Sequence, residues 1–125
     1  LKAGTPETFA AHTGGRLESV IENLTFAAAE APALLIRIPL ITGINDIPDE
    51  RNAMTEILYR LHQLRRRKHN RNLAVELLKL HHFGAPKYRA MGQTYLLEGR
   101  PEPAPGNVGD LEQKLTSLGM EIQKN

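Results

Sequence analysis

The sequence holds 125 residues, of which 41% are hydrophobic and 24% are charged, with a formal net charge of +2. A chain of this size and composition can bury a core, which excludes a disordered or fibrous protein. It contains no cysteine, which excludes a disulfide, a thiol nucleophile and any metal or iron–sulfur site ligated by its own thiolates.

No apolar run reaches the roughly 20 residues that a membrane-spanning helix needs, and no charged segment followed by an apolar one marks a secretory signal. We therefore expect a cytoplasmic protein with no membrane partner. The sequence opens with Leu1-Lys2 rather than with Met, and we interpret Leu1 as the end of an element that begins upstream.

The first half of the chain predicts a loop, a helix and a strand. Residues 4–14 are rich in Gly, Thr and Pro and predict a loop with one helical turn. Residues 15–30 carry apolar side chains at steps of three and four, which indicates an amphipathic helix that ends before Pro32. Residues 34–41 form a continuous apolar run, typical of a strand buried on both faces, and Pro39 predicts an irregular C-terminal end.

A long helix and a second strand follow. Asp46 or Asp49 can cap the helix, with Pro48 at an early position, and the basic run of residues 65–71 lies at its C-terminal end. Its apolar stripe consists of Met54, Ile57, Leu58, Leu61 and Leu64. Residues 73–80 form another apolar run. Two such strands joined by a helix predict a right-handed βαβ unit with a parallel sheet.

The remaining residues give secondary-structure patterns of unequal strength. Residues 86–92 predict a short helix, whereas residues 99–107 predict an extended Pro-rich connector on the surface. Residues 108–118 have helical apolar spacing, and Gly119 is a good residue to end that helix. Residues 120–122 predict a terminal strand.

Ligands of parallel α/β folds bind just beyond the C-terminal ends of the strands. Three features fall at such positions: residues 43–46 after the first strand, residues 81–84 after the second, and Lys2 if Leu1 ends an earlier strand. These segments are therefore the candidate site.

Arg37 is a charged residue inside an apolar strand, and an unpaired buried charge costs several kcal/mol. It must reach an anion or solvent. One interpretation is a carboxylate or phosphate of a ligand inside a barrel; the other, which we favour from the spacing alone, is an ion pair with Glu76 on the next strand.

Two further motifs are weak indicators of function. His81 and His82 are neighbours on a strand and point to opposite faces, so they cannot easily share a zinc ion. The basic run of residues 65–71 has no interleaved aromatic residue, which favours a solvated helix end over a nucleic-acid site.

Four stretches in a fixed order resemble the C-terminal half of glycyl radical enzyme activating enzymes of the pyruvate formate-lyase activating type. Residues 1–2 resemble the end of an Asp-x-Lys motif, and residues 36–46 resemble Arg-x-Pro-(apolar)2-Pro-Gly-x-Asn-Asp. Residues 75–92 resemble Val-Glu-Leu-Leu-Pro-Tyr-His-x-x-Gly-x-x-Lys-(Trp/Tyr)-x-x-(Leu/Met)-Gly, and residues 95–99 match Tyr-x-Leu-x-Gly. The resemblance covers nearly the whole chain.

The resemblance implies an α/β fold in which this chain is the C-terminal portion of a partial (βα)6 radical SAM barrel, with parallel strands and flanking helices. It implies S-adenosylmethionine and a [4Fe–4S] cluster as cofactors, and a glycyl radical enzyme as the partner that receives the radical. Lys2, Arg37 and His81 would face S-adenosylmethionine. The rim toward the partner would comprise Asn45, Asp46, Gly84, Lys87 and Tyr88. No residue of this chain is assigned as catalytic or as a metal ligand.

The chain departs from this pattern because it lacks the cluster cysteines and the glycine-rich strand, and because Lys79-Leu80 replace Pro-Tyr. We therefore expect residues 1–125 to be a single fragment that is inactive alone. The alternatives are a non-catalytic half-barrel docking module and a basic nucleic-acid-binding domain. A half-barrel leaves strand edges and an apolar face open, which predicts self-association.

Overall fold

The computed structural model describes residues 1–79 and 105–124. Its elements are α1 (Pro6–Thr13), α2 (Leu17–Glu30), β1 (Leu35–Leu40), α3 (Pro48–His69), β2 (Ala74–Lys79), α5 (Pro105–Ser117) and β3 (Glu121–Ile122). The predictions made for residues 80–104 lie outside the described residues. These are the short helix at 86–92, most of the Pro-rich connector, and the site residues His81, Gly84, Lys87 and Tyr88.

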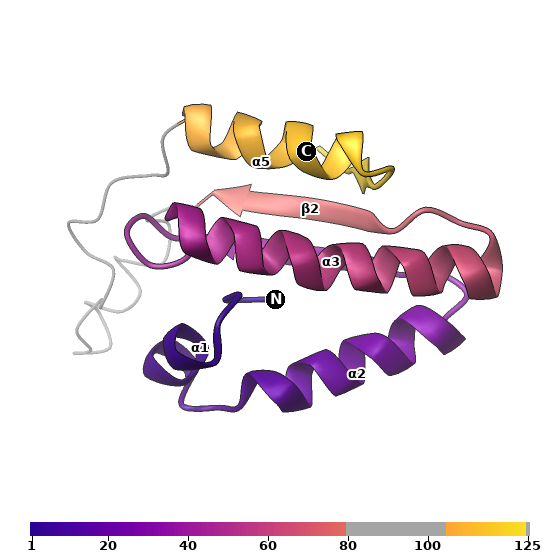
Figure 1. Ribbon diagram of the computed structural model, residues 1–125, viewed down its shortest axis with the longest axis horizontal. Helices are drawn as coiled ribbons and strands as arrows, with labels where there is room; N and C mark the ends of the chain where they lie inside the picture. Colours follow the sequence, from indigo (N-terminus) through magenta and orange to yellow (C-terminus); the bar gives the residue numbers. More distant parts are fainter. Residues whose placement is uncertain (80–104, 125) are drawn as a thin grey trace, which may run out of the picture.

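The sheet is parallel, with its described strands in the order β1-β2-β3. In β1 and β2 the register places Leu35 opposite Ala74 and Leu40 opposite Lys79. The helix α3 connects β1 to β2, and in Figure 1 it lies across the sheet with α5 above and α2 below. The predicted βαβ arrangement and the α/β fold class are confirmed.

The main core lies between this helix layer and one face of the sheet. Buried side chains of β1 and β2 contact buried side chains of α3 and α5, and α2 packs against α3. Burying each of the larger aliphatic side chains contributes about 1.5–3 kcal/mol. The buried members of this core are Ala28, Ile36, Ile38, Leu40, Met54, Leu58, Leu61, Leu73, Val75, Val108, Leu111, Leu115 and Met120.

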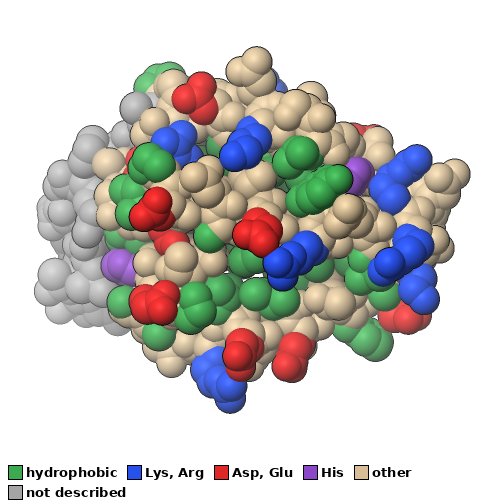
Figure 2. Space-filling view, viewed as in Figure 1, with side chains coloured by type: hydrophobic (Ala, Val, Ile, Leu, Met, Phe, Trp, Pro, Cys, Tyr) green, Lys and Arg blue, Asp and Glu red, His purple; other side chains and the backbone are tan. Residues whose placement is uncertain are grey.

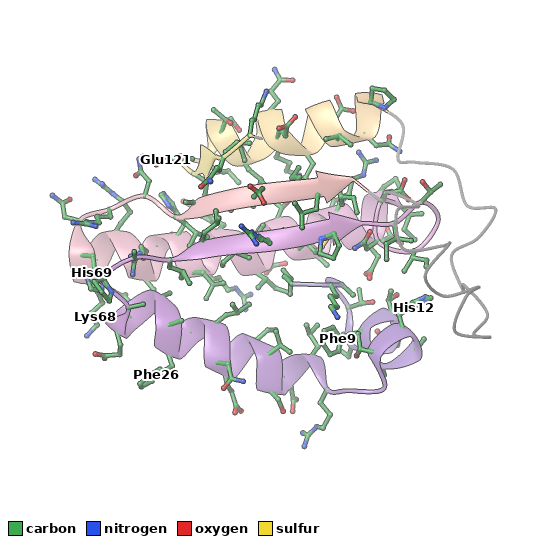
Figure 3. All side chains as sticks on the ribbon, turned by 180° about the vertical axis from the view of Figure 1, so that it is seen from behind. Phe9, His12, Phe26, Lys68, His69 and Glu121 are labelled. Atoms are coloured by element: carbon green, nitrogen blue, oxygen red, sulfur yellow. The ribbon has the colours of Figure 1, made fainter. Side chains whose placement is uncertain are left out.

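Among residues 1–79 and 105–124 nothing covers the other face of β1, which corrects the prediction of a strand buried on both faces. In β1, Ile36 and Ile38 are buried, whereas Arg37 between them is exposed. The sticks in Figure 3, seen from behind, show β1 and β2 in front of α3 with this face toward the viewer. Helices cover only one face of the sheet within the described ranges, so alternate residues of β1 remain accessible.

Pro39 does not disturb the strand, contrary to the prediction of an irregular end, because β1 keeps its register with β2 through Leu40. The Arg37 carbonyl accepts a hydrogen bond from Leu1 N at 3.0 Å, so it points to the free edge of β1. Pro39 follows two residues later and presents its backbone to the same edge. Its missing N–H therefore removes no hydrogen bond to β2.

Three helix ends differ from the predictions. The loop expected at residues 4–14 contains the eight-residue helix α1, which Thr5 caps by accepting from Thr8 N. The first turn of α3 is preceded by Ile47, without a side-chain cap, instead of by Asp46 or Asp49. The helix α5 begins at Pro105, so the last residues of the predicted connector are helical.

The end of α5 follows the prediction for Gly119, which adopts a φ of 96°. Gly119 N donates to Thr116 O at 3.0 Å, and Met120 N donates to Leu115 O at 3.1 Å. This pair of bonds is a Schellman motif, which satisfies the last carbonyls of the helix and turns the chain. The chain then enters β3, in agreement with the predicted terminal strand.

Arg65, on α3, closes the C-terminal end of α2. Its residue is only 2% exposed, and its guanidinium donates to the carbonyls of Ala28, Ala31 and Pro32. The last carbonyls of a helix have no partner within the helix and carry the negative end of its dipole. No basic residue lies in the last turn of α2 itself, so Arg65 supplies the missing donors from a neighbouring helix.

Two other members of the basic run also contact carbonyls at the C-terminal end of α2. His69 Nε2 lies 2.8 Å from Ala29 O, and Arg71 Nη1 donates to Pro32 O at 3.2 Å. Figure 2 shows blue side chains gathered where α3 ends, and Arg66, Arg67 and Lys68 are exposed members of the run. Part of this run therefore holds α2 against α3, and a solvated helix end describes only the rest.

Arg65→Met should reduce the free energy of unfolding by about 2–3 kcal/mol, because buried carbonyls lose charge-assisted donors. Urea denaturation of the chain measures this change. Arg67→Met is the matched control: Arg67 is exposed on the same turn, and its replacement should change stability by less than about 0.5 kcal/mol. Equal effects of the two variants would contradict the capping role.

His62 joins α3 to the segment that leads into β2. Its Nδ1 accepts a hydrogen bond from Leu73 N at 3.1 Å, and its ring stacks on Tyr59 with centroids 6.4 Å apart. Burial, with a smaller contribution from the nearby Arg66 charge, lowers the pKa of His62 below its usual 6.5. Protonation at Nδ1 would also abolish the bond from Leu73, so the folded state favours the neutral ring.

The chain should therefore lose stability as the pH falls below about 6.5, because the unfolded state then binds a proton that the folded state rejects. Urea denaturation at steps between about pH 5.5 and 7.5 tests this, in a range above most carboxylate titrations. In His62→Asn, Oδ1 can accept from Leu73 without titrating, so the free energy of unfolding should depend less steeply on pH. An unchanged dependence on pH would show that other titrating groups cause it.

Candidate functional site

Three segments meet at the C-terminal end of β1: residues 1–4, the loop of residues 41–47 and the first turn of α3. Residues 1–4 lie along the free edge of β1, as the bond from Leu1 N to Arg37 O indicates. Two of the three features predicted for the site, Lys2 and the loop containing Asn45 and Asp46, thus come together. The third, His81, lies outside the described residues.

Asn45 connects these segments. Its Nδ2 donates to Pro39 O at 2.6 Å and to Lys2 O at 3.1 Å, while its Oδ1 accepts from Ile41 N at 2.7 Å. The residue is 0% exposed. All its strong hydrogen-bonding groups are therefore used inside the protein, on the end of β1, the loop and the N-terminal segment.

Asp46 organises the loop itself. Its Oδ1 accepts from Gly43 N at 2.7 Å, and the residue is buried. Gly43 has a φ of 75°, a conformation that favours glycine. The two side chains predicted at the rim thus point into the loop, and what they shape is its backbone. A direct rim contact for either of them stays a prediction.

Glu50 fixes the N-terminal segment from the other side. It is 2% exposed, and its Oε1 lies 3.4 Å from Gly4 N, which donates to it. Gly4 runs so close to α3 that an added Cβ would lie 2.6 Å from Met54 N and 2.7 Å from Glu50 O. This close approach is a contact that glycine alone permits, and sequence composition had indicated only a loop here.

Arg37 projects from the open face of the sheet. Its Nε lies 3.2 Å from Oε1 of Glu76, its register partner on β2, and this ion pair confirms the interpretation that the spacing favours. The Glu76 side chain is 4% exposed, whereas that of Arg37 is 65% exposed. One edge of the guanidinium therefore pairs with Glu76. The side chain remains accessible from the open face, so its other N–H groups are free to donate to an anion.

Two features of residues 1–79 and 105–124 concern metal and membrane binding. No group of three or more His, Asp or Glu side chains in these ranges could hold a metal ion. No helix in them is long and apolar enough to cross a membrane. A shallow hollow of about 410 Å³ opens among Arg66, Arg71 and Glu121, near the end of α3.

Replacing Gly4 with Ala should force the N-terminal segment away from α3 and lower the free energy of unfolding by about 1–3 kcal/mol. Gly109→Ala, on α5, is the matched control. An added Cβ there meets nothing within 4 Å, and Ala is the better helix former, so stability should rise by up to about 1 kcal/mol. Thermal denaturation distinguishes the two, and a stabilising Gly4→Ala would contradict the close approach.

The sequence matches three curated proteins. It is 33% identical over 89 residues to a choline trimethylamine-lyase activating enzyme of Oleidesulfovibrio alaskensis, covering 71% of this chain and 27% of that protein. It is 29% identical over 106 residues to the pyruvate formate-lyase 2-activating enzyme of Escherichia coli, covering 85% and 33%. It is 33% identical over 89 residues to a (2S)-3-sulfopropanediol sulfolyase activating enzyme of Bilophila wadsworthia, covering 70% and 26%.

The fold has a solved counterpart. A crystal structure of a domain of pyruvate-formate lyase-activating enzyme from Bacteroides vulgatus matches 98% of this chain and 62% of its own, with a TM-score of 0.71 and 20% sequence identity. No protein-family model matches the chain. The chain spans about a quarter to a third of the length of the curated relatives that it matches.

Proposed function

Because the chain is homologous to glycyl radical enzyme activating enzymes over most of its length, we propose that it forms the C-terminal part of such an enzyme. The complete enzyme would be a radical SAM protein with a partial (βα)6 barrel. It would generate a glycyl radical on a partner enzyme, with S-adenosylmethionine and a [4Fe–4S] cluster as its cofactors.

The position of Arg37 carries this proposal. A cation on the open face of a parallel sheet, held by a buried carboxylate, suits an anionic ligand that lies across the ends of the strands. The carboxylate of S-adenosylmethionine is such a group. Lys2, which is exposed beside the same strand, is the second cation that could face it.

The residues of this chain fit one cofactor and not the other. Ligation of the cluster needs thiolates, and the sequence has no cysteine, so we propose that the cluster ligands lie outside these 125 residues. In the family, S-adenosylmethionine and the cluster together supply the radical chemistry that takes a hydrogen atom from a backbone glycine of the partner.

In this proposal the described residues bind the ligand and orient it. Arg37 would bind the ligand carboxylate with the donors that Glu76 leaves accessible, and Glu76 would hold the guanidinium in place. The loop of residues 41–47 would close the end of the site toward the partner. The relatives' names include three different lyases, so the partner is proposed as a class, a glycyl radical enzyme.

Arg37→Ala in the complete enzyme should weaken S-adenosylmethionine binding about 10- to 100-fold, the equivalent of one or two charge-assisted hydrogen bonds. Isothermal titration calorimetry under anaerobic conditions measures the affinity. Arg37→Lys should recover only part of the affinity. An ammonium group lacks the planar set of donors with which a guanidinium can bind Glu76 and the ligand at the same time.

Arg16→Ala is the matched control. Arg16 also pairs with a glutamate, at 2.8 Å, but this pair is exposed and belongs to no strand of the sheet. The Arg16→Ala enzyme should bind S-adenosylmethionine as tightly as the wild type. A wild-type enzyme that binds no S-adenosylmethionine would contradict the proposal and leave a non-catalytic docking module as the alternative.

A further inference from the structure

We propose that Asn45 is a positioning residue that holds Lys2 beside Arg37, and that it acts on the ligand only through Lys2. The role of Lys2 toward an anionic ligand rests on the proposed function. The contact between Asn45 and Lys2 does not, because it is a hydrogen bond between described residues.

The burial of Asn45 decides how it can act. A side chain with 0% exposure cannot touch a partner or a ligand from its present position. Its three hydrogen bonds join segments that are far apart in sequence, since Lys2 and Asn45 are separated by 43 residues. Its effect on the site must therefore pass through the segments that it holds.

The segment that it holds is the one that carries Lys2. The backbone on either side of Lys2 is fixed by two further bonds, from Leu1 N to Arg37 O and from Gly4 N to Glu50 Oε1. The Asn45 amide binds the Lys2 carbonyl between them. Ala3 is buried and Lys2 is exposed, so these anchors direct the Lys2 side chain outward at the edge of the strand that bears Arg37.

Asn45 also fixes this segment to the end of β1, because the same Nδ2 that donates to Lys2 O donates to Pro39 O. The Pro39 carbonyl faces the edge of β1 away from β2, and the Asn45 amide donates to it at 2.6 Å. No other side-chain type of this size offers two donors and one acceptor in this geometry. We therefore expect Asp or Ala at this position to release Lys2.

A mutant cycle in the complete enzyme tests the proposal. Lys2→Ala and Asn45→Ala should each weaken S-adenosylmethionine binding about tenfold, and the double variant should be no more than about twofold weaker than either one. Asn23→Ala, at an exposed position of α2, should bind like the wild type. Losses that multiply in the double variant would overturn the proposal, because Asn45 would then act independently of Lys2.

A measurement on the wild-type chain keeps the proposal testable if Asn45→Ala fails to fold. The side-chain amide protons of Asn45 should exchange slowly in NMR spectra and show NOEs to Lys2 and Pro39. Rapid exchange without these NOEs would overturn the proposal. If they are seen but the complete wild-type enzyme binds no S-adenosylmethionine, the proposed function fails and the anchoring of Lys2 by Asn45 stands.

Discussion

The parallel pairing of β1 with β2 is the constraint on which the rest of the structure depends. Parallel strands need a crossover, and here it is α3, whose 22 residues span about 33 Å. The six residues of β1 span only about 20 Å. The helix therefore extends beyond the sheet, and at its far end Arg65 and His69 meet the last carbonyls of α2. The same pairing brings the C-terminal ends of both strands to one edge, where the candidate site lies.

The apolar pattern was sufficient to predict the elements that build the core. The helices α2 and α3 were predicted near their observed bounds from apolar residues at helical spacing, and the strands β1 and β2 from short continuous apolar runs. The ion pair between Arg37 and Glu76 could also be predicted, since two apolar runs of similar length in parallel register place these residues opposite each other. Such inferences need only local pattern and a simple topology.

The contacts that sequence reasoning missed join residues distant in the chain. Arg65 was assigned to a solvated helix end because its neighbours are basic, and only the packing of α3 on α2 reveals its carbonyl partners. The family resemblance implied that Asn45 lies at the rim, and only the structure reveals that it is buried and makes three internal hydrogen bonds. Polar residues carry no periodic signal that distinguishes an internal donor from an exposed one, so their roles follow from tertiary structure.

The open face of the sheet explains why an arginine suits position 37. Glu76 is nearly buried, and a carboxylate without a partner there would cost several kcal/mol. Arg37 neutralises it with one edge of a planar group and remains 65% exposed, so it can meet a second anion without leaving the first. That second anion would lie near the Glu76 charge, and the repulsion would set a limit on its affinity. A site of this kind favours a ligand that also makes contacts elsewhere, as the proposed ligand S-adenosylmethionine would, over a small free anion.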